Sequence, residues 1–99
     1  MEDEKLKQLK ERFGELISVE YSGVEFFFRK PGRIEYKRYY DKLLESVYDA
    51  SYVLVLDLVV VPTRDQSAAF IEQDPTMPVK VASSLTGFFG STVAASQKI

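Results

Sequence analysis

Any catalysis by this sequence would depend on carboxylates, hydroxyls and amines, because the chain contains neither histidine nor cysteine. Those two residue types supply the commonest general base, the commonest transition-metal ligand and the thiol nucleophile. Asp57 is the acid set deepest in an apolar run, where burial would make it a candidate acid or base. No second acid is placed to share such work. We therefore expect Asp57 to lie on the polar edge of a buried helix, and we expect no catalytic residue.

Metal and cofactor sites are not indicated either. Asp49, Asp65 and Asp74 are scattered and lack the spacing of a calcium-binding loop. A phosphate-binding loop uses several glycines, whereas Lys30-Pro31-Gly32-Arg33 has one. We expect no metal and no cofactor.

Basic residues are concentrated between positions 29 and 42, with tyrosines among them. The six are Arg29, Lys30, Arg33, Lys37, Arg38 and Lys42. Such a stretch could bind nucleic acid, although the formal net charge of -2 provides no long-range attraction for a polyanion. We expect the tyrosines to form the buried stripe of a helix and the basic side chains its solvated face. A small nucleic-acid-binding regulator remains the less favoured alternative.

Aromatic residues are the more informative feature, with 7 Phe and 6 Tyr in 99 residues. Phe27 should point away from Phe26 and Phe28 on a strand, so either the N-terminal helix covers it or it contacts a partner. Phe88 and Phe89 form a second candidate contact. The predicted partner-binding residues are Phe27, Arg29, Lys30, Arg33, Lys37, Arg38, Phe88 and Phe89.

The first half of the chain predicts a helix and a hairpin. Apolar residues spaced 3 and 4 apart over 3–13, followed by Gly14, are typical of a short amphipathic helix with a glycine stop. Residues 17–21 and 24–28 alternate between apolar and other side chains around Ser22-Gly23, which predicts a β-hairpin.

The rest of the chain predicts about four helices. The strongest helical pattern is Tyr36, Tyr39, Tyr40, Leu43, Leu44 and Val47. The apolar run 50–61 suits a strand or a helix, and its length between a capping Asp49 and Pro62 favours a helix. Thr63 and Gln66 predict a capping box that opens a helix burying Ala69, Phe70 and Ile71. The last helix should be capped by Thr76 and bury Met77, Val81, Leu85 and Phe88.

These elements predict an α+β fold: an N-terminal helix and a β-hairpin followed by about four packed helices. We expect a single domain over 1–90 and a flexible tail over 91–99. The acidic start indicates no export signal, and the longest apolar run is about half a bilayer span. A cytoplasmic protein without membrane contact is expected.

The segment 28–39, Phe-Arg-Lys-Pro-Gly-Arg-Ile-Glu-Tyr-Lys-Arg-Tyr, resembles a stretch of the small tail assembly chaperones of long-tailed bacteriophages. In that family an aromatic-Arg-Lys/Arg-Pro-Thr/Gly-Arg-x-Glu-aromatic-x-Arg-aromatic motif joins a hairpin to a helix. The resemblance continues loosely to the final helix, through the run that ends at Val59-Val60-Val61-Pro62. Here Gly32 takes the cap position, so the side-chain half of a capping box with Glu35 is missing.

This resemblance implies a non-enzymatic role in binding the tape-measure protein, keeping its apolar helical segments soluble and promoting tail-tube assembly. The implied partners are the tape-measure protein, the major tail (tube) protein and a longer frameshifted form of the chain, and self-association is left open. The implied location is the host bacterial cytoplasm, with absence from the mature virion. A phage structural adaptor retained in the virion is the alternative within the same setting.

Overall fold

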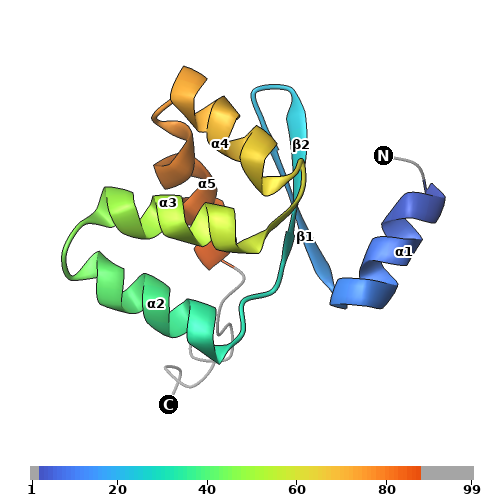
Figure 1. Cartoon of the computed structure of the whole chain (residues 1–99), viewed down its shortest axis with the longest axis horizontal. Helices are drawn as coiled ribbons and strands as arrows, with labels where there is room; N and C mark the ends of the chain where they lie inside the picture. The colour runs from blue at the N-terminus through green and yellow to red at the C-terminus, as the bar shows by residue number, and fades with distance from the viewer. Residues whose placement is uncertain (1–2, 88–99) are drawn as a thin grey trace, which may run out of the picture.

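A three-stranded antiparallel sheet lies at the centre of the computed structural model, which describes residues 3–87 (Figure 1). Its strands are β1 (Leu16–Tyr21), β2 (Val24–Arg29) and β3 (Val59–Val61), in the order β1-β2-β3. Ser22 and Gly23 both have positive φ angles, 53° and 79°, as the tight turn of a hairpin requires. The predicted hairpin is confirmed.

Helices cover the two faces of the sheet unequally (Figure 1). Four helices lie on one side: α2 (Arg33–Leu43), α3 (Val47–Leu58), α4 (Arg64–Gln73) and α5 (Met77–Thr86). The other side, which we call the outer face, has α1 (Asp3–Phe13) beside it. The expected α+β fold is therefore confirmed, including the four helices that follow the hairpin. None of the helices between residues 3 and 87 has the length and apolar character needed to cross a membrane.

The hydrophobic core lies between the sheet and the four-helix side. The hairpin register places Ile17 opposite Phe28 and Val19 opposite Phe26, so these four side chains share the inner face. Phe26 and Phe28 are fully buried and their ring centroids are 6.3 Å apart. The fully or almost fully buried helical residues packed in this core include Leu54, Val55, Leu58, Met77, Val81 and Leu85.

The apolar run 50–61 forms both a helix and a strand. The helix α3 begins earlier than expected, because the side chain of Ser46 accepts a hydrogen bond from the backbone N–H of Asp49. Ser46, not Asp49, is the cap. After Leu58 the chain becomes β3 and pairs with β2, so the prediction of a helix up to residue 61 is wrong for Val59–Val61.

The tyrosine-rich pattern from Tyr36 to Val47 is divided between two helices. The helix α2 ends at Leu43 and buries none of its residues, while Val47 starts α3. Tyr39 packs against the core, but Tyr36 and Tyr40 are 44% and 55% exposed. The expectation that the tyrosine stripe as a whole is buried is therefore wrong, because α2 rests on α3 through the face that carries Tyr39.

The helices α4 and α5 lie where the sequence predicted them, with one difference in each. Thr63 and Gln66 form the expected capping box, each side chain accepting from the other's backbone N–H at 3.1 Å. Ile71 is buried and Phe70 packs against the core, but Ala69 is exposed, contrary to prediction.

Met77, Val81 and Leu85 of α5 are buried as expected. Thr76 occupies the cap position of α5, but its side chain caps no N–H of the helix and its hydroxyl donates to Asp74 instead. Phe88 and the predicted tail 91–99 lie outside the described residues.

Candidate functional site

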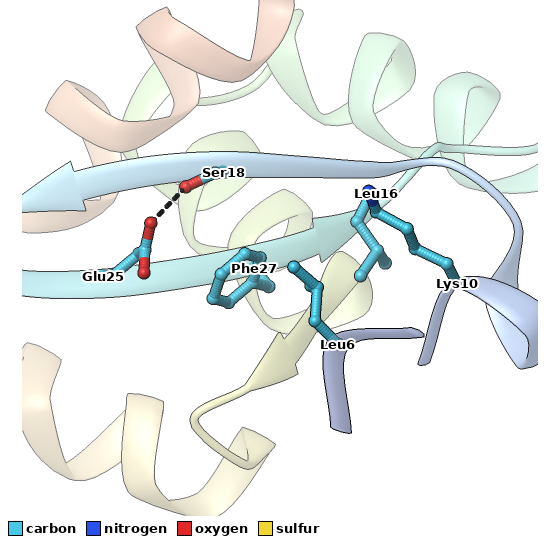
Figure 2. Close-up of a pocket in the computed structure, with 6 residues that line it drawn as sticks. All are labelled: Leu6, Lys10, Leu16, Ser18, Glu25 and Phe27. Atoms are coloured by element: carbon cyan, nitrogen blue, oxygen red, sulfur yellow. Dashed lines mark hydrogen bonds between the residues drawn. The ribbon is translucent and has the colours of Figure 1, made fainter. Parts of the chain in front are cut away.

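A pocket of about 330 Å³ lies between α1 and the outer face of the sheet (Figure 2). Leu6 and Leu16 point toward the ring of Phe27 and give the pocket an apolar interior. Polar groups lie at its edge, where Ser18 donates a hydrogen bond of 2.9 Å to Glu25 and where Lys10 enters from α1. We call this the α1–sheet pocket; its lining residues are Leu6, Lys10, Leu16, Ser18, Glu25 and Phe27.

Strand alternation places these side chains on the outer face. Ser18 is opposite Phe27 and Glu20 is opposite Glu25 in the register, and each directly opposed pair shares a face. Phe27 thus faces away from the core rings that flank it in sequence. On this face Phe27 and Leu16 are apolar, whereas Ser18, Glu20 and Glu25 are exposed polar residues.

The helix α1 forms the second wall of the pocket. Gly14 ends the helix with a φ of +79°, and its N–H donates to the carbonyl of Lys10 at 2.8 Å. A side chain at position 14 would be strained in this left-handed conformation. The apolar residues Leu6, Leu9 and Phe13 are only partly buried, so α1 keeps apolar surface open to solvent.

Phe27 itself is 7% exposed. Of the two alternatives that the sequence left open, an exposed ring and a ring covered by the N-terminal helix, this low exposure and the position of Leu6 beside the ring agree with the second (Figure 2). Phe27 is therefore an almost fully covered residue that lines the α1–sheet pocket.

The side chains of Arg29 and Arg38 form hydrogen bonds that connect the sheet, α2 and α3. Arg29 binds the carboxylate of Glu35 at 3.1 Å and the carbonyl oxygen of Asp57 at 3.1 Å. Arg38 binds the carboxylate of Asp57 at 2.8 Å. Asp57 lies at the polar edge of α3, as expected. These two predicted partner-binding arginines therefore have structural contacts within the chain.

Of the remaining basic residues of the stretch, Lys30, Arg33 and Lys37 are exposed and Lys42 is partly buried. Lys30 pairs with Glu15 at 2.9 Å, and Lys37 pairs with Asp41 at 2.7 Å. Between residues 3 and 87, Arg33 is the one predicted basic residue without an ion pair. The structure does not bring the basic residues together with Phe27 into one site, and Phe88 and Phe89 lie outside the described residues.

Two carboxylates outside the pocket have altered acidity. The backbone N–H of Gly32 and the guanidinium of Arg29 hold the pKa of Glu35 below its ordinary value. The hydroxyl of Tyr21, which donates to Asp74 at 2.7 Å, and that of Thr76 likewise lower the pKa of Asp74.

These lowered pKa values predict acid sensitivity. A carboxylate with a lowered pKa stabilises the fold fully above its unfolded-state pKa, and this contribution is lost as the pH falls through the folded-state value. We expect Tyr21→Phe to lower Tm at pH 7, and we expect the difference from the unmodified chain to shrink below about pH 4. Thermal denaturation from pH 7 to pH 3 measures this, with Tyr40→Phe as the control. A difference that stays constant with pH would contradict the role of Asp74.

Sequence reasoning found Phe27 but missed most of the pocket. In the predicted hairpin, strand alternation places Leu16, Ser18 and Glu25 on the same face as Phe27, so these three lining residues could have been identified from the sequence. Leu6 and Lys10 could not be assigned, since nothing local in the sequence fixes the angle at which α1 meets the sheet. Within residues 3–87 there is no group of three or more acidic side chains that could hold a metal ion.

Comparisons with known proteins place the chain in a family. The fold is similar to a solved structure of an uncharacterised protein, rbstp2171, from Bacillus stearothermophilus, with a TM-score of 0.77 and 21% identity over 86% of this chain and 91% of that one. None of the curated proteins matches the sequence. A family model matches residues 9–98, and the chain belongs to that family, which is described as Domain of unknown function (DUF6848).

Proposed function

We propose that this protein is a non-catalytic binding protein that holds apolar helical segments of another protein in the α1–sheet pocket. The observation that carries the proposal is the pocket's composition. Its interior consists of Leu6, Leu16 and Phe27, while its edge is polar. Apolar interiors with a few polar groups at the edge are typical of binding sites.

The size of the pocket favours a side chain over a large ligand. At about 330 Å³ it is at the lower end of the range of about 300–1,000 Å³ for small-molecule sites. One or two large apolar side chains would fill it. A helix that lies across the opening would present such side chains at positions i and i+3 or i+4.

The surroundings of the pocket support a helical partner. The partly exposed Leu9 and Phe13 extend the apolar surface along α1 beyond the pocket itself. Lys10 and Glu25 provide one charge of each sign at the edge, which suits the mixed polar face of an amphipathic helix.

The resemblance of residues 28–39 supports the tape-measure protein as the partner and tail assembly as the process. The protein would then act in the host cytoplasm, keep tape-measure segments soluble while tube subunits assemble, and leave before the virion is complete. The ion pairs of the basic residues favour a protein partner over nucleic acid, because phosphates would have to compete with carboxylates already in place.

Co-expression with an apolar tape-measure fragment tests this proposal. We expect the chain to raise the soluble fraction of the fragment, and we expect Leu6→Glu to abolish the gain by placing a carboxylate in the apolar interior. Gln8→Glu is the matched control, since it adds the same charge at an exposed position of α1. Equal precipitation of the fragment with and without the chain would refute the proposed function.

A further inference from the structure

A row of exposed apolar residues runs along α2 and is separate from the α1–sheet pocket. Tyr36, Tyr40 and Leu44 lie four residues apart and therefore share one face of the helix. They are 44%, 55% and 81% exposed. The rings of Tyr36 and Tyr40 are stacked, with centroids 6.2 Å apart. We call these three residues the α2 stripe.

A charged row flanks the α2 stripe. Arg33, Lys37, Asp41 and Glu45 also lie four residues apart and are all exposed, with Glu45 just beyond the end of the helix. The two residues nearer the N-terminus are basic and the two nearer the C-terminus are acidic. The row therefore has a positive half and a negative half.

This order of charges gives the helix one ion pair of its own, Lys37 with Asp41 at 2.7 Å, but is otherwise unfavourable for the helix. Basic groups near a helix N-terminus and acidic groups near its C-terminus oppose the helix dipole. Lys preceding Asp by four residues is also the less favourable orientation of such a pair. Elsewhere α2 follows the favourable order, with Glu35 in its first turn and Lys42 in its last. The reversed order is therefore confined to the exposed row beside the α2 stripe.

We propose that a second copy of the chain binds the α2 stripe, with the two α2 helices packed antiparallel about a two-fold axis near Tyr40. In that arrangement the basic half of each charged row lies beside the acidic half of its partner's row. Leu44 of one copy packs near Tyr36 of the other. A parallel two-fold arrangement would carry the two charged rows to opposite sides of the interface, where they could not pair with each other. Val47 and Tyr48, 58% and 40% exposed at the start of α3, extend the apolar surface at each end.

Sedimentation velocity of the full chain measures this dimer at concentrations from about 1 to about 300 µM. We expect a concentration-dependent dimer whose dissociation constant rises at least about tenfold in Tyr40→Glu, because two carboxylates would meet at the axis. Val79→Glu is the matched control, since it adds the same charge to a 40% exposed apolar residue of α5. A chain that stays monomeric at the highest concentration, or a dimer that is insensitive to Tyr40→Glu, would overturn the inference.

Charge variants test the complementarity. The all-acidic variant Arg33→Glu/Lys37→Glu and the all-basic variant Asp41→Lys/Glu45→Lys should each be monomeric alone, and they should form a heterodimer when mixed. A mixture that stays monomeric would count against the charged row as part of the interface. Circular dichroism of each variant checks that α2 remains folded.

Cysteine cross-linking tests the orientation, and the chain has no cysteine of its own to interfere. A mixture of Tyr36→Cys and Leu44→Cys should form a disulfide between copies, whereas Tyr36→Cys alone should not. The reverse result would indicate a parallel dimer and contradict the proposal. If the chain is monomeric but Tyr40→Glu prevents capture of the tape-measure fragment, the occupant is the partner protein, which refutes the dimer and leaves the proposed function standing.

Discussion

Phe28→Ala is expected to lower the free energy of unfolding by about 3–5 kcal/mol. Phe28 is fully buried, lies beside Phe26 and faces the helices of the inner side. Its removal takes away transfer free energy and leaves a cavity that the surrounding strands and helices can fill only in part. Because a domain of this size is stable by about 5–15 kcal/mol, the variant should lose between about a fifth and all of its stability.

Urea denaturation at low protein concentration measures this loss. Tyr40→Ala is the control, because it removes an aromatic ring that is 55% exposed, and we expect it to cost less than about 1 kcal/mol. Equal losses in the two variants would show that the assignment of Phe28 to the core and of Tyr40 to the surface is wrong.

Arg29→Ala is the second substitution with a large expected effect, a loss of about 2 kcal/mol. Arg29 donates to Glu35 and to the carbonyl of Asp57, and so connects β2 to the first turn of α2 and to the end of α3. Without Arg29, the carboxylate of Glu35 and the carbonyl of Asp57 each lose a charged hydrogen-bond donor, and both of these hydrogen bonds are partly buried. For a domain of this size the loss corresponds to a fall in Tm of about 8–16 °C.

Thermal denaturation distinguishes this structural role from a role in partner binding. Lys30→Ala removes the neighbouring positive charge, whose ion pair with Glu15 is exposed, and should change stability by less than about 0.5 kcal/mol. Arg29→Lys should recover only part of the loss, since an ammonium lacks the planar fork that reaches two acceptors. An unchanged Tm for Arg29→Ala would leave partner contact as its main role.

Local signals in the sequence predicted most of the elements. The Ser22-Gly23 turn, the Gly14 stop and the Thr63–Gln66 capping box each depend on residues a few positions apart, and each is present in the structure. The alternation in the hairpin also fixed the core face of the sheet, because only one register puts Ile17 and Val19 opposite the buried phenylalanines.

The errors in prediction come from long-range contacts. Val59–Val61 continue the apolar run of α3, and only pairing with β2 makes them a strand. The packing of Tyr39 against the core and the exposure of Tyr36 and Tyr40 depend on which face of α2 meets α3, and a pattern with apolar residues on both faces does not decide this.

The candidate site could likewise be predicted from the sequence only where local patterns suffice. The position of Phe27 on the outer face follows from strand alternation alone. Its cover by α1 depends on the angle between α1 and β1, which the backbone conformation at Gly14 sets. The arginines looked like a surface patch because sequence does not show that Arg29 and Arg38 would meet Glu35 and Asp57.

The most direct test of the central claim is to identify by NMR which residues of the protein contact a bound apolar helix. An isotope-labelled chain would be titrated with a synthetic amphipathic helix from the apolar part of a tape-measure protein. We expect the largest shift changes at Leu6, Leu16 and Phe27, and we expect Leu6→Glu to weaken binding at least about tenfold while Gln8→Glu does not. Absence of shift changes in the α1–sheet pocket, with or without changes elsewhere, would contradict the claim that this pocket binds apolar helices.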